Sequence, residues 1–125
     1  MTSALIYFQV FVLGLLFPND LPYEQLEKSF ESNNSEYIIS NCENTVLLVV
    51  DGDEGIYNHS QAQMVLSDFF RHYPNGEFEY RFQGKESDEE IFSVGSYIVD
   101  SYKFTVLLSF SKEFKNRIQS INISK

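Results

Sequence analysis

The chain has 125 residues and a formal net charge of −9, with nine Lys and Arg against 18 Asp and Glu. This balance disfavours a nucleic-acid partner and an anionic membrane surface, because both are bound by neutralising negative charge. The length predicts one domain, and the single cysteine, Cys42, cannot form an internal disulfide.

The first twenty residues differ in character from the rest. The run Ala4–Phe17 is almost wholly apolar, and Asp20 is the first charged side chain. A stable membrane span needs about 20 apolar residues, so the run is too short for one, but it has the length of a signal-peptide core. It lacks a basic start and an Ala-x-Ala site before Pro18. We interpret residues 1–20 as an imperfect export signal to the periplasm or the medium, with a terminal hydrophobic segment of a cytoplasmic protein as the alternative.

Two short helices are expected next. Pro22 suits the first turn of a helix, and Leu26 and Phe30 mark the apolar side of that helix. Asn34 or Ser35 can cap a second helix, because either side chain can accept a hydrogen bond from an unpaired backbone N–H.

A strand, a turn and the longest expected helix follow. Residues 46–50 are continuously apolar, which predicts a strand buried on both faces, and residues 51–55 turn the chain. Asn58 or Ser60 can cap the helix, which Pro74 ends. Its apolar stripe, at helical spacing, consists of Ala62, Val65, Leu66, Phe69 and Tyr73.

Neither the acidic turn nor the two histidines fit a metal site. A calcium loop that starts at Asp51 would need a Glu at its last position, where Ala62 stands instead. His59 and His72 have no third ligand near them in sequence, and a zinc site needs three or four converging ligands. The sequence therefore predicts no metal and no cofactor.

Four long antiparallel strands are expected after the helix. Apolar residues alternate along the first and third of them, and Gly95 in the second is a candidate bend or bulge. In the last strand the apolar residues change phase by one position, which predicts a bulge there. The residues expected to share one face are Phe78, Tyr80 and Phe82 in the first strand and Tyr102, Phe104, Val106, Leu108 and Phe110 in the third; the phase change concerns Ile118, Ile121 and Ile123.

The run around the long helix carries a resemblance to a known family. Its pattern consists of Gly55, Tyr57, Gln61, Ala62, Leu66, Asp68, Phe69 and Phe70. This pattern resembles domain-of-unknown-function family 4783, a family of short secreted bacterial proteins, over residues 21–125. The resemblance implies an α+β fold of the nuclear transport factor 2-like, cystatin-like kind. In that fold, N-terminal helices and one lid helix pack on a curved antiparallel sheet as a cone-shaped domain, here residues 21–125. The family has no established activity.

Three functional hypotheses follow. The first is an exported, non-catalytic domain that binds a small apolar ligand or a protein partner in or at the cone, since ligand sites lie in such mouths. The second is a structural or interaction domain with a filled core, and a homodimer is left open. The third is a cryptic enzyme of the isomerase or dehydratase kind, which needs an acid inside the cone. No catalytic residue is identified. The candidate ligand-binding residues are Tyr80, Phe82, Tyr97, Tyr102 and Phe104.

Overall fold

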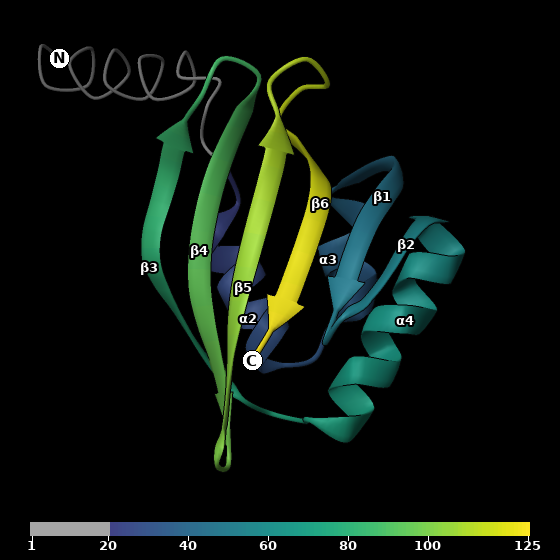
Figure 1. The fold of residues 1–125 in the computed structure, drawn as a ribbon, viewed down its shortest axis with the longest axis vertical. Coiled ribbons are helices and arrows are strands. Elements are labelled where there is room, and N and C mark those ends of the chain that lie inside the picture. Colours follow the sequence, from purple (N-terminus) through teal and green to yellow (C-terminus); the bar gives the residue numbers. More distant parts are fainter. Residues whose placement is uncertain (1–20) are drawn as a thin grey trace, which may run out of the picture.

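The structure is a computed structural model that describes residues 21–125 (Figure 1). The predicted export signal at residues 1–20 lies outside the described residues. Two short helices precede a β-hairpin, a long helix and four long strands. The elements are α2 (Tyr23–Glu31), α3 (Ser35–Ser40), β1 (Cys42–Val50), β2 (Asp53–Asn58), α4 (His59–His72), β3 (Glu77–Glu86), β4 (Glu90–Val99), β5 (Tyr102–Ser111) and β6 (Arg117–Ser124).

The six strands form one curved sheet in the order β2-β1-β6-β5-β4-β3. Neighbouring strands are antiparallel except for β1 and β6, the first and last strands in the chain, which lie side by side and run parallel. In Figure 1, α2 and α3 lie behind the sheet and α4 lies beside the β1–β2 hairpin. We call the face toward the helices the inner face and the opposite face the outer face. Within residues 21–125, no helix is long and apolar enough to cross a membrane.

The helix caps settle two alternatives. The Asn58 side chain accepts a hydrogen bond from the Gln61 N–H at 2.9 Å, and the Gln61 side chain accepts one from the Asn58 N–H at 3.3 Å. This reciprocal capping box starts α4, so Asn58 rather than Ser60 is the cap. Asn34 rather than Ser35 caps α3, because its side chain accepts from the Tyr37 N–H.

Strand β1 is buried on one face only. Val46 and Leu48 point inward and are fully covered, whereas Leu47 and Val49 on the outer face are half-buried. The prediction of burial on both faces therefore holds for the inner face alone. The reason is that the helices form a layer on the inner face of the sheet, while the two outward side chains keep contact with solvent.

The predicted bulge in the last strand is confirmed. Ser109 pairs with Ser120, but Phe110 pairs with Ile118, so β6 has one extra residue, Gln119, between the two pairs. The extra residue shifts the alternation by one position. As a result Ile118, Ile121 and Ile123 are all buried despite their uneven spacing.

A second bulge lies in β3, and it overturns one expectation. Tyr80 pairs with Gly95, but Phe82 pairs with Val94, so Arg81 is the extra residue. The bulge turns Phe82 to the outer face, where 44% of its surface is exposed. The prediction that Phe82 shares a face with Phe78 and Tyr80 is therefore wrong.

Gly95 stands opposite this bulge and allows a close approach. A Cβ atom added there would lie 2.5 Å from the ring of Phe78. The ring therefore lies directly over the glycine backbone and reaches the core.

Aromatic side chains fill the inner face of the sheet. Phe30 from α2 stacks on Phe78 of β3 with ring centroids 4.8 Å apart. Phe69 from α4 meets Phe104 of β5 edge to face at 5.0 Å. Such edge and stacked pairs stabilise a packed interior beyond simple area burial. In the described part of the chain, rings from the helices thus pack directly on rings of the sheet in the core.

Candidate functional site

Two of the five residues predicted to bind a ligand lie in this packed core. Tyr97 and Phe104 are both 0% exposed. The Tyr97 hydroxyl donates to the Tyr73 carbonyl at 2.7 Å, and it accepts from the Gly76 N–H and from the Asn33 side-chain amide, each at 3.0 Å. All three hydrogen-bonding positions of the Tyr97 hydroxyl are therefore occupied by groups of the protein.

The other three predicted residues lie apart from one another. Tyr80 is half-buried, and its hydroxyl donates to the Tyr23 carbonyl at 3.0 Å. Phe82 is on the outer face, as described above. Tyr102 is 43% exposed and packs edge to face on Tyr73, with ring centroids 5.0 Å apart. The five side chains do not converge on one cavity, and ligand binding by them stays a prediction.

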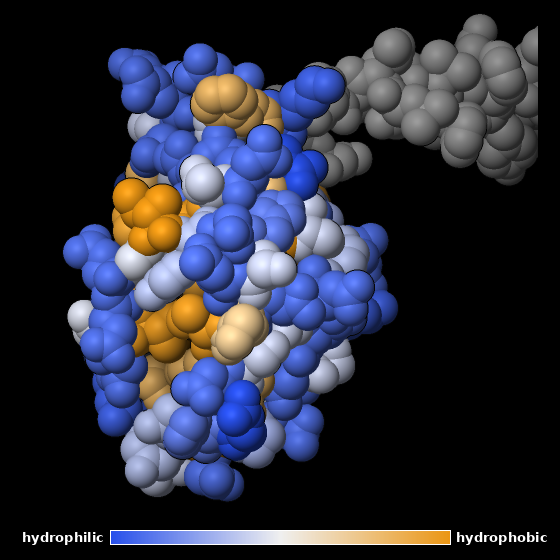
Figure 2. Space-filling model, turned by 90° about the vertical axis from the view of Figure 1, so that its right-hand side faces the viewer, coloured by the Kyte–Doolittle hydropathy of each residue, from blue (hydrophilic) through white to orange (hydrophobic). Residues whose placement is uncertain are grey.

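The structure instead has a cleft between α4 and the β1–β2 hairpin. Its volume is about 910 Å³. Figure 2 shows this side of the molecule, with a hydrophobic recess bordered by hydrophilic residues. The residues that line it are Val50, Asp51, Asp53, Tyr57, Ser60, Gln63, Met64, Val65, Ser67, Asp68, Phe69, Arg71, His72 and Tyr73.

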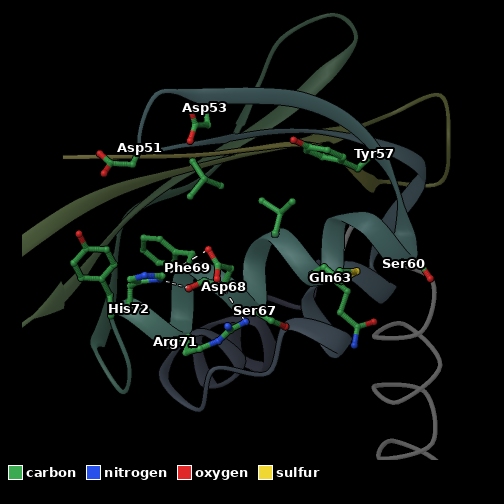
Figure 3. A pocket seen from close by; sticks show the side chains of 14 residues that line it. Asp51, Asp53, Tyr57, Ser60, Gln63, Ser67, Asp68, Phe69, Arg71 and His72 are labelled. Atoms are coloured by element: carbon green, nitrogen blue, oxygen red, sulfur yellow. Dashed lines mark hydrogen bonds and ion pairs between the residues drawn. The ribbon is translucent and has the colours of Figure 1, made fainter.

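Apolar and aromatic side chains form the walls of this cleft. Val50 comes from β1, and Val65 and Phe69 come from α4. Tyr57 lies on the strand side of the cleft, opposite the helix (Figure 3). A Cβ atom on Gly55 would lie 2.4 Å from the Tyr57 ring, so the glycine lets this ring lie flat along β2.

Charged groups surround the cleft at its rim. Asp68 lies 3.5 Å from Arg71 and 3.9 Å from His72, and Asp51 lies 3.8 Å from Lys125 (Figure 3 shows the α4 charges). These side chains are largely exposed, so solvent screens the pairs and each stabilises the fold little.

The acids of the cleft are not held in an apolar cavity. The steroid-isomerase kind of site needs an acid held in an apolar cavity. Among residues 21–125, no Asp or Glu side chain is buried, and the acids of the cleft lie at its exposed rim. The described residues also contain no group of three His, Cys, Asp or Glu that could hold a metal ion.

Cys42 and His59 do not line the cleft, and both make contacts that stabilise the fold. Burial raises the pKa of the Cys42 thiol to about 12, and the nearby Arg117 opposes this only in part. The thiol therefore stays protonated near neutral pH and is a poor nucleophile. The His59 ring lies 2.8 Å from the carbonyl oxygen of Glu43, which ties the start of α4 to β1.

Sequence reasoning did not find the cleft as a site. Helical spacing predicts Val65 and Phe69 as part of the apolar stripe of the helix, and Tyr57 enters the sequence analysis only as part of the family pattern. The cleft depends on the distance between α4 and β2, and no local pattern encodes that distance. The one local signal is Met64 beside Val65, because it widens the apolar face of α4 beyond the stripe that the sheet covers.

Comparison with known proteins settles the family. Residues 23–124 match the family described as Domain of unknown function (DUF4783). The chain belongs to this family. The match confirms the resemblance predicted from the motif around α4. No curated protein matches the chain significantly.

Solved DUF4783 structures agree with the fold. The chain is 25% identical to a DUF4783 family protein from Bacteroides uniformis ATCC 8492, with a TM-score of 0.74 and coverage of 85% of this chain and 97% of that one. A DUF4783 family protein from Bacteroides fragilis YCH46 is 21% identical, with a TM-score of 0.72 and coverage of 85% and 99%.

A more distant structure shows the wider fold class. An uncharacterised cystatin fold protein from Novosphingobium aromaticivorans is 10% identical, with a TM-score of 0.60 and coverage of 82% of this chain and 94% of that one. At this identity the likeness concerns the fold alone. The predicted cystatin-like, nuclear transport factor 2-like α+β architecture is thereby confirmed for this DUF4783 protein.

Proposed function

We propose that this DUF4783 protein is a non-catalytic binding domain whose site is the cleft between α4 and the β1–β2 hairpin. The observation that supports this is an open cleft of about 910 Å³ beside an interior packed with aromatic rings. Ligand pockets typically measure about 300–1,000 Å³ and combine apolar walls with a few polar groups. The cleft has both properties.

The walls of the cleft favour an apolar group on the ligand. Val65 offers apolar area from the helix, and Tyr57 and Tyr73 offer rings that are half-buried in the free protein. Phe69 also lines the cleft, but only 5% of its surface is exposed. Covering such area removes it from water, which stabilises a complex by about 25 cal/mol per Å² before the cost of association. The charged side chains at the rim keep the entrance of the cleft hydrated, and they orient the polar parts of the ligand.

Nile red, a neutral dye that fluoresces in apolar surroundings, tests this site. We expect saturable binding to the wild type, and we expect Val65→Trp to weaken binding about tenfold or more by filling the recess, a loss equivalent to about 1.4 kcal/mol. Val94→Trp is the matched control, because Val94 is also half-buried but lies on the outer face. Equal binding by the two variants, or no binding by the wild type, would contradict the assignment.

We also propose that the protein is exported. The apolar run Ala4–Phe17 supports this, because it has the length of a signal-peptide core. Mass spectrometry of the protein purified from its own cells is expected to show a mature chain that lacks this run. A full-length chain recovered only from the cytoplasmic fraction would reject export.

A further inference from the structure

Strand β2 is an open edge of the sheet. Among residues 21–125 it pairs only with β1, in an unbroken register from Val50 with Asp53 to Thr45 with Asn58. A two-residue turn joins the strands, and both of its residues have positive φ angles: 50° for Asp51 and 93° for Gly52. Such a turn is typical of a tight, regular hairpin.

The register determines which backbone groups are free. In a two-residue hairpin the closing pair, Val50 with Asp53, exchanges both of its hydrogen bonds, and bonded pairs alternate with non-bonded pairs along the ladder. Gly55 and Tyr57 therefore bond to β1. Glu54 and Ile56 direct their N–H and C=O groups to the open edge.

The opposite edge of the sheet is less suited to accept a strand. The register of β3 shifts twice, once at Arg81 and once between Phe82 and Lys85. At its start, the Phe78 N–H already donates to the Glu31 carboxylate of α2 at 3.0 Å. Bulges and covered groups of this kind block pairing with another chain. Strand β2 has an unbroken register, and its one outward N–H that is covered within the described residues is that of Asn58 at the end of the strand, which donates to the Gln61 side chain at 3.3 Å.

The cleft lies where an added strand would need space. Side chains of a strand alternate between the two faces of a sheet. A strand beside β2 would therefore direct every second side chain to the inner face, toward α4. On that side, Val65 is half-buried and Met64 is 72% exposed, and Figure 3 shows an open gap between the helix and the hairpin.

The charges near this edge select the kind of segment. Among residues 21–125, Asp53 and Glu54 form no ion pair, and they project to opposite faces of β2. The net charge of −9 attracts a cationic partner and repels a second copy of this chain. A segment with basic side chains beside Glu54 and apolar side chains over α4 complements the edge.

We propose, on the basis of the cleft function above, that an extended segment of a partner protein adds to β2 as a seventh strand. Basic residues in this segment alternate with apolar ones, and the apolar side chains fill the cleft. Main-chain hydrogen bonds to Glu54 and Ile56 hold the segment, and the cleft selects its side chains, which is the division of roles in strand addition.

A synthetic peptide provides the probe. The peptide consists of about eight alternating lysine and valine residues, a typical strand length, and is blocked at both ends. At saturation we expect hydrogen exchange of the Glu54 and Ile56 amides to slow by about tenfold or more, because both become hydrogen-bonded. A peptide with glutamate in place of lysine is expected not to bind.

One pair of variants isolates the backbone contribution. Ile56→Pro removes the outward N–H but leaves the pairing with β1, and proline is tolerated on edge strands in this orientation. Ile56→Val keeps the N–H and an exposed branched side chain, so it is the control. We expect Ile56→Pro to weaken peptide binding about tenfold or more and Ile56→Val to change it less than about twofold. Neither substitution should alter Nile red binding, because Ile56 does not line the cleft.

The outcomes separate this inference from the function on which it rests. Strand addition is overturned if the peptide binds without slowing exchange at Glu54 and Ile56, or if Ile56→Pro binds as well as Ile56→Val. It is also overturned if the peptide fails to bind while Nile red binds in the cleft, and the binding function then stands. Failure of both probes overturns both.

Discussion

Leu66→Ala is expected to lower the free energy of unfolding by about 2–5 kcal/mol. Leu66 is 0% exposed and lies in the buried stripe of α4 with Ala62, Phe69 and Phe70. Truncation removes apolar contacts and leaves a cavity that the aromatic neighbours cannot close without leaving their own contacts. Urea unfolding with linear extrapolation measures the change.

Met64→Ala is the control for this prediction. Met64 is on the same helix but is 72% exposed, so its truncation should change the free energy of unfolding by less than about 0.5 kcal/mol. A loss below about 1 kcal/mol for Leu66→Ala would show that α4 is not the packed lid of the sheet.

Tyr97→Phe is expected to cost about 1–3 kcal/mol although it removes one oxygen atom. The Tyr97 hydroxyl joins the Tyr73 carbonyl, the Gly76 N–H and the Asn33 side chain. These groups belong to the end of α4, the start of β3 and the turn between α2 and α3. Without the hydroxyl, the buried Gly76 N–H and the half-buried Tyr73 carbonyl and Asn33 amide each lose a partner. A buried group left without a partner is the costly case for a hydrogen bond.

Tyr102→Phe is the matched substitution, because the Tyr102 ring is 43% exposed. We expect it to change stability by less than about 0.5 kcal/mol in the same urea experiment. Equal effects of the two substitutions would mean that the Tyr97 hydroxyl does not hold the three segments together.

Local patterns predicted much of the fold because their causes are local. The cap at Asn58 depends on a side chain that reaches a backbone N–H three residues away. The stripe with Leu66 depends on helical spacing, and the bulge at Gln119 was visible as a phase change in the isoleucines of β6. In each case the residues that cause the structure are neighbours in sequence.

Local patterns could not predict how deeply the candidate ligand-binding side chains are buried. Alternation placed Phe82 with Tyr80, but one extra residue, Arg81, turned it outward. Tyr97 and Phe104 are on the inner face, where rings from α2 and α4 cover them completely. Burial depends on what a distant helix places above a strand, and alternation along the strand does not contain that information.

The cleft was missed for a related reason. Its walls come from Val50, Tyr57 and Phe69, which lie in three different elements. Each side chain matches a core pattern locally. Only the position of α4, which projects past the edge strand β2, leaves part of this apolar surface uncovered. A cleft that exists because no further strand covers the edge strand cannot be recognised from the residue pattern of any single helix or strand.

Mapping of bound Nile red by nuclear magnetic resonance tests the central claim, that the cleft beside α4 is the binding site, most directly. The account predicts that the resonances of Tyr57, Val65 and Phe69 shift on titration and that those of Phe82 on the outer face do not. Shifts that cluster on the outer face around Phe82, with the cleft unchanged, would contradict it.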